Sequence, residues 1–147
     1  DTPCRALDTR LTSPVQADVP TPIKITGITT GGANCEVPDT AVGAALNFTI
    51  TGAQGAGHLT VWPSGPVPAT SVLNFTPGED VANAVDIGLG TGGTVLVQPF
   101  ATTHLVVDIY GYFTDVEELP EFSTALGDLA LFNNTGSLNT ARSCFFK

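Results

Sequence analysis

Residues 44–63, AALNFTITGAQGAGHLTVWP, contain the pattern that decides the fold. Apolar and polar residues alternate over residues 46–51, which is the two-residue period of a strand with one buried face. Glycines interrupt the pattern over residues 52–57, and the alternation resumes over residues 59–63. The stretch therefore predicts a central β-hairpin.

Short apolar segments continue on both sides of this hairpin, separated by Gly/Pro turns. The predicted strands lie at residues 3–10, 23–28, 70–76, 81–89, 94–100 and 103–113. The last is almost continuously apolar, which predicts a central strand buried on both faces or one that bends at Gly111. No segment before Asp115 has a convincing helical period. We therefore expect an all-β fold, a β-sandwich of jelly-roll or immunoglobulin-like type with about eight to ten strands.

The chain divides into a β-sandwich domain at residues 1–114 and a C-terminal extension at residues 115–147. The extension opens with an acidic, proline-containing stretch, and two apolar segments, 126–132 and 137–146, then predict a hairpin. Such a segment can dock on its own domain or add a strand to a neighbouring subunit. Its possible subunit contacts are Leu129, Leu131, Phe132, Phe145 and Phe146.

The amino-acid composition indicates in which compartment the protein works and which classes of partner it can bind. Charged residues make up 13% of the chain, about half the usual ~25%, and the formal net charge is −9. This balance disfavours nucleic acid and anionic membranes, and no apolar run reaches the ~20 residues of a membrane helix. A chain that begins Asp-Thr-Pro and lacks Met fits a secreted protein after removal of a signal peptide. We expect a homo-oligomer with no membrane insertion.

Three cysteines suit an oxidising compartment, and their odd number leaves one over. A Cys4–Cys35 bridge is favoured, because it would tie the N-terminal segment to the loop before the central hairpin and contribute ~3–4 kcal/mol by loop closure. Cys144 would then be unpaired or bonded to another molecule, and a Cys4–Cys144 pairing stays open. Neither His58 nor His104 has a zinc-ligand spacing to a cysteine, so we expect no metal and no cofactor.

Four ordered motifs carry a resemblance to a known family. They are PCRALDTR (3–10), AALNFTITGAQGAGHLTVWPSG (44–65), LNFTPGEDVAN (73–83) and VVDIYGYF (106–113). Together they resemble a repeat domain of secreted and cell-surface bacterial proteins. The resemblance implies an extracellular, non-catalytic β-domain used for attachment or structure, and it supports pairing Cys4 with Cys35. It does not extend to the segment after residue 114 or to tandem copies.

Acidic residues offer the main candidate chemistry. Asp8 and Arg10, together with Asp108, are expected to form an ion-paired group that ties the first strand to the last. Loss of one partner from such a group, when buried, costs ~3–5 kcal/mol. The alternatives are a catalytic carboxylate pair drawn from Asp8, Asp86 and Asp108, as in glycoside hydrolysis, and a calcium site.

Two functions are compatible with these residues. The first is a secreted, non-catalytic structural protein that assembles with its own copies into an extracellular fibre, pilus-like filament or surface layer. The alternative is a glycan- or cell-wall-binding module with Trp62 as a platform for polysaccharide, although Trp62 can equally pack in the core. An enzyme is not expected, because no nucleophile motif accompanies the two histidines.

Overall fold

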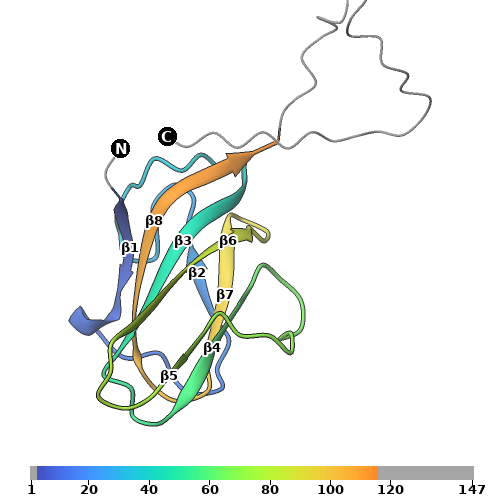
Figure 1. Ribbon diagram of the computed structural model, residues 1–147. Helices are drawn as coiled ribbons and strands as arrows, with labels where there is room; N and C mark the ends of the chain where they lie inside the picture. Colours follow the sequence, from blue (N-terminus) through green and yellow to red (C-terminus); the bar gives the residue numbers. More distant parts are fainter. Residues whose placement is uncertain (1–2, 116–147) are drawn as a thin grey trace, which may run out of the picture.

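Eight β-strands and one short 3-10 helix form the part of the chain that the computed structural model describes, residues 3–115 (Figure 1). The elements are β1 (Cys4–Asp8), η1 (Thr9–Leu11), β2 (Thr21–Lys24), β3 (Ala41–Thr51), β4 (Gly57–Trp62), β5 (Leu73–Phe75), β6 (Val81–Gly88), β7 (Thr94–Pro99) and β8 (His104–Thr114). The predicted all-β class is confirmed. Within the described range, no helix has the length and apolar character needed to cross a membrane.

The strands form two four-stranded antiparallel sheets. Sheet one has the order β1-β8-β3-β6 and sheet two the order β2-β7-β4-β5. The first strand pairs with the eighth, the second with the seventh, the third with the sixth and the fourth with the fifth. The chain is thus one long antiparallel hairpin rolled into two layers, which is the jelly-roll form of the predicted sandwich.

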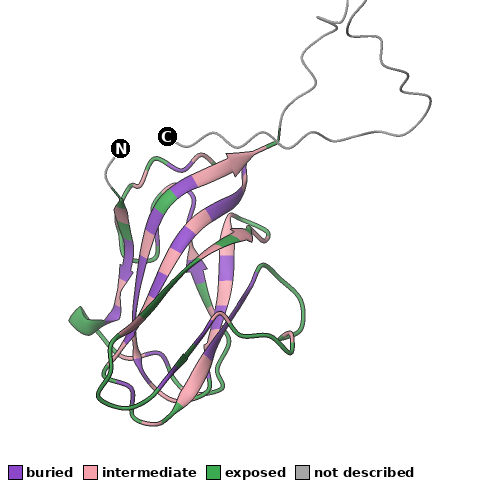
Figure 2. Ribbon diagram, in the orientation of Figure 1, coloured by how far each residue is buried: buried purple, intermediate pink, exposed green. Residues whose placement is uncertain are grey.

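The core lies between the two sheets, and it is formed by the side chains at every second position of the strands. In β3, Leu46, Phe48 and Ile50 are at most 1% exposed, while the polar residues between them are only partly buried (Figure 2). Sheet two supplies the opposing layer, which includes Ile23 and Leu59. The alternation predicted for residues 46–51 is therefore confirmed.

The central hairpin was a wrong prediction. β3 and β4 belong to different sheets, so the glycine-rich segment between them carries the chain across the sandwich. Its backbone bonds to the other crossing at that end, since the Gln54 amide donates to the Thr102 carbonyl at 2.9 Å. A tight glycine turn has the same sequence signature in a hairpin and in a crossover, because both reverse the chain direction.

Strand β8 lies between β1 and β3 and is irregular near Gly111. Leu105, Val106 and Val107 are all buried, whereas Tyr110 is 53% exposed. The register with β3 shifts between Ile109 and Gly111. Burial on both faces thus holds only for the first part of the strand. Near Gly111, where the sequence predicted a bend, the structure has a register shift.

Candidate functional site

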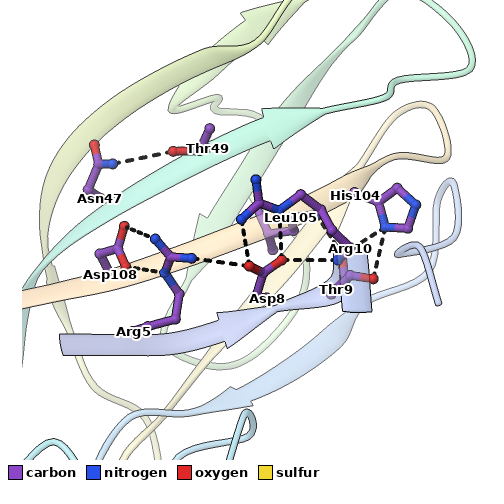
Figure 3. Close-up of polar contacts among 9 residues, drawn as sticks. All are labelled: Arg5, Asp8, Thr9, Arg10, Asn47, Thr49, His104, Leu105 and Asp108. Carbon is purple, nitrogen blue, oxygen red and sulfur yellow. Dashed lines mark hydrogen bonds and ion pairs between the residues drawn. The ribbon is translucent and has the colours of Figure 1, made fainter. Parts of the chain in front are cut away.

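An ion-paired group occupies the face of sheet one where β1 meets β8 (Figure 3). Arg5 lies between two carboxylates: its Nε and Nη2 donate to Asp108, the latter at 3.4 Å, and its Nη1 donates to Asp8 at 3.1 Å. Arg10 donates to the other side of Asp8 through Nε at 2.9 Å and Nη2 at 2.6 Å. The group therefore links β1, η1 and β8.

Local backbone geometry sets the Asp8–Arg10 contact. Asp8 is the N-cap of η1, and its side chain also accepts a hydrogen bond from the Arg10 amide at 3.1 Å. The Arg10 side chain then turns back toward the Asp8 carboxylate and donates to it. Hydrogen bonds from Arg10 lower the pKa of Asp8 from 3.8 to about 2.

The predicted group of Asp8, Arg10 and Asp108 needs two corrections. Asp108 joins it only through Arg5, a residue outside the predicted group. The group is also only partly buried: the Asp8 and Asp108 side chains are 12% and 18% exposed, but the Arg5 and Arg10 side chains that pair with them are 47% and 53% exposed. The large penalty of a broken buried ion pair does not apply here, because water screens exposed charges.

Beside this group, Thr9 attaches η1 to β8. The Leu105 amide donates to the Thr9 hydroxyl at 2.8 Å, and the His104 Nδ1 donates to the Thr9 carbonyl at 2.9 Å. Thr9 is 6% exposed, so these bonds are largely shielded from water. His104 therefore has a structural contact, and the site as a whole fastens the first strand to the last.

The catalytic alternative is not supported by the arrangement of the carboxylates. Asp8 and Asp108 share one arginine, whereas Asp86 is on β6 at the opposite edge of the sheet, two strand spacings or ~10 Å from β8 and two residues out of register with Asp108. Among residues 3–115, no group of three or more His, Cys, Asp or Glu side chains is placed to hold a metal ion.

Acid titration of Asp8 gives a first testable prediction. A carboxylate whose pKa is lower in the folded than in the unfolded protein stabilises the fold when ionised, and this contribution is lost as the pH falls from 3.8 to about 2. Asp8→Asn should remove that part of the acid dependence, measured by urea unfolding at a series of pH values. Asp18→Asn, at an exposed position outside both the group and β6, is the control and should follow the parent. Equal acid profiles for Asp8→Asn and the parent would contradict the assignment.

Trp62 is not a surface platform. It is 4% exposed, and its Nε1 donates to the Gly65 carbonyl at 3.0 Å. The loop after β4 folds back over the outer face of that strand, where Thr60 also bonds the Thr70 carbonyl at 2.7 Å. Strand alternation places Trp62 on the outer face, but this loop covers it.

The structure tests the predicted disulfide but not the predictions about the C-terminal extension. Cys4 and Cys35 are bridged, with their Cα atoms 5.6 Å apart, which confirms the favoured pairing. Cys144 and the possible subunit contacts all lie outside the described residues. They are Leu129, Leu131, Phe132, Phe145 and Phe146.

The most open edge of the sandwich is β6, the last strand of sheet one. The Leu89 amide donates to the Val42 carbonyl, so odd-numbered residues here face β3. The even-numbered residues consequently direct their amides and carbonyls away from the sheet, where they have no backbone partner among residues 3–115. They are Ala82, Ala84, Asp86 and Gly88.

The other three edges are blunted. At β1, the Gly31 amide bonds the Ala6 carbonyl at 2.8 Å. At β2, the Thr30 hydroxyl and amide bond the backbone of Lys24, and β5 is only three residues long. By contrast, β6 has eight residues, contains no Pro or Lys, and borders a hollow of about 310 Å³ at its Gly88 end. Natural edge strands usually carry such protection, and among residues 3–115 β6 has little beyond the charge of Asp86, which marks β6 as the candidate interaction site.

Comparison with protein-family models, with curated protein sequences and with solved structures gave no match to this chain. The function must therefore be inferred from the chain's own residues.

Proposed function

We propose that this chain is a secreted, non-catalytic structural protein that assembles with its own copies by strand addition at β6. The carrying observation is the open eight-residue edge, whose outward amides and carbonyls can pair with an incoming strand. The bridge between Cys4 and Cys35 supports an oxidising, extracellular compartment. The resemblance to bacterial cell-surface repeat domains supports the same role.

The incoming strand in this proposal is residues 126–132, LGDLALF, of a neighbouring copy. Val85 and Ile87 of β6 are half-buried and face the interior, whereas Ala82 and Ala84 are small and exposed. An added strand would place Leu129 and Leu131 beside the two larger residues and extend the apolar layer. Each strand added in this way uses one copy's extension and another copy's edge, a head-to-tail contact that continues into a filament when it does not close into a ring or a reciprocal pair.

The low charge content of the surface supports contact between copies. Only 13% of residues are charged, so few charged side chains need to be desolvated when two copies meet. At β6 itself, Asp86 is the single charged residue of the strand. Assembly should therefore be stronger at moderate salt, because salt screens the net charge of −9 that each copy carries.

Blocking the edge tests this function. Ala84→Pro removes an amide that faces away from β3, so it should leave the ladder intact and prevent strand addition. We expect the parent to form species larger than 15.1 kDa in multi-angle light scattering, and both Ala84→Pro and a chain lacking residues 117–147 to be monomeric.

Ala84→Ser is the matched control, since it keeps the amide, and it should assemble like the parent. A parent that is monomeric at every concentration contradicts the proposal, as does a truncated chain that assembles normally. A monomeric parent whose truncation exposes the β6 amides to hydrogen exchange would show instead that the extension docks on its own domain.

A further inference from the structure

A row of three side chains crosses the outer face of sheet two. Strand order places β7, β4 and β5 side by side, and the register pairs His58 with Asn74. Phe100, just after β7, lies opposite His58 on the other side, and its amide donates to the His58 carbonyl at 2.9 Å. Leu59 and Phe75 point into the core, so their neighbours His58 and Asn74 point outward.

The row begins with an exposed aromatic ring. Phe100 is 56% exposed and stacks on the His58 imidazole, with ring centroids 5.4 Å apart and an interplanar angle of 22°. Because one face of the phenyl ring is used by His58, the exposure belongs to the rest of the ring. An exposed phenylalanine held in a fixed orientation presents an apolar surface to a ligand at little entropic cost.

Next to the ring, the row borders a polar hollow of about 330 Å³. Its lining comes from β4, β5 and the loop between them: His58, Pro68, Ala69, Thr70, Ser71 and Asn74. Within residues 3–115, the side chains of Thr70, Ser71 and Asn74 make no hydrogen bond to other protein groups. The loop carrying two of them is held in place, because its Thr70 carbonyl accepts from Thr60.

We propose that this row and hollow bind a neutral polysaccharide. A sugar ring has apolar C–H faces that pack on an aromatic side chain and hydroxyls that bond to amides and hydroxyls, and both partners are present side by side here. No lining residue is Asp, Glu, Lys or Arg, so an anionic polymer has no counter-charge in the hollow, and the net charge of −9 repels it.

The site is separate from the assembly edge, so it extends the proposed function rather than restating it. β6 belongs to sheet one, whereas the three binding residues lie on or beside strands of sheet two. The edge strands β5 and β6 lie next to one another, since the Asn83 side chain of β6 donates to the Val72 carbonyl, but the three binding side chains point outward from sheet two, so a strand that pairs with the β6 backbone does not have to cover them. The same protein would then both polymerise and attach to a glycan surface.

Binding is tested with the full chain and a panel of soluble neutral polysaccharides, namely laminarin, xylan, galactomannan and starch, by affinity electrophoresis and calorimetry. We expect at least one to bind and alginate, an anionic control, not to bind. Phe100→Ala and Asn74→Ala should each weaken binding by about tenfold. Both residues are exposed, so the variants should keep the parent's thermal unfolding.

Tyr110→Ala is the matched control, because Tyr110 is a similarly exposed aromatic residue, 53%, on the other sheet. It should bind as the parent does. The proposal is overturned if no neutral polysaccharide of the panel binds, or if binding survives in the Phe100→Ala/Asn74→Ala double variant. Binding that is lost only when residues 117–147 are removed would assign it to the extension and equally overturn the site.

Discussion

Phe48→Ala should lower the free energy of unfolding by about 3–5 kcal/mol, the largest effect expected from a single substitution in this chain. Phe48 is the largest of the fully buried side chains. It lies in the middle of β3, opposite Asn83 of β6 and Val107 of β8, so residues on both sides are held by ladder bonds. Such surroundings relax little, and the cavity left by the ring adds to the lost burial.

Urea unfolding monitored by Trp62 fluorescence measures this effect as a lower midpoint with an unchanged slope. Thr49→Ala is the control, because the neighbouring side chain points to the other face of the same strand and is only partly buried. It should change stability by less than about 1 kcal/mol. If both variants lost a similar amount of unfolding free energy, the result would contradict the burial of Phe48 between the two sheets.

Removing the disulfide should cost about 3–4 kcal/mol. The bridge closes a segment with a sequence separation of 31, and loop-closure entropy for that length gives this magnitude. It also anchors β1, an edge strand whose one strand partner among residues 3–115 is β8, to the loop that precedes β3. The Cys4→Ser/Cys35→Ser double variant should therefore unfold at a lower urea concentration than the parent.

Reducing agent provides the control for that experiment. Dithiothreitol should destabilise the parent to the level of the double variant and leave the double variant unchanged. Cys144→Ser should retain the sensitivity of the parent to reduction. If Cys144→Ser instead abolishes that sensitivity, the stabilising bridge in solution involves Cys144 and the Cys4–Cys35 assignment is wrong.

Strand positions were predictable because a strand with one buried face has apolar residues at every second position. Leu46, Phe48 and Ile50 carry that period, and the structure buries all three. The sandwich class followed from the number and spacing of such segments. The pairing of the strands could not be predicted in the same way. Strand β3 pairs with β8, which is more than fifty residues away in the sequence, and no local pattern indicates that contact.

The same limit explains the two corrections at the sites. Asp8 and Arg10 were found because they are two residues apart in the sequence, whereas Arg5 meets Asp108 only through the pairing of β1 with β8. Trp62 was a candidate platform because nothing in its strand shows that a loop returns over it. Phe100 and His58 were not singled out as a pair, since their contact also depends on strand order.

The disulfide also determines how the domain would carry tension. Strand β1 begins and β8 ends at the same end of sheet one, because Cys4 lies opposite Ile109 and Ala41 opposite Thr114 (Figure 1). A pull on residues 3 and 115 enters through Cys4 and passes through the bridge to Cys35, so the bridged loop, which contains β1 and β2, is not stretched along its chain. The force instead peels β3 from β8 one hydrogen bond at a time, starting at Ala41. Under a pulling force the sandwich therefore unfolds by successive rupture of the β3–β8 hydrogen bonds. The disulfide carries the force past the segment between Cys4 and Cys35.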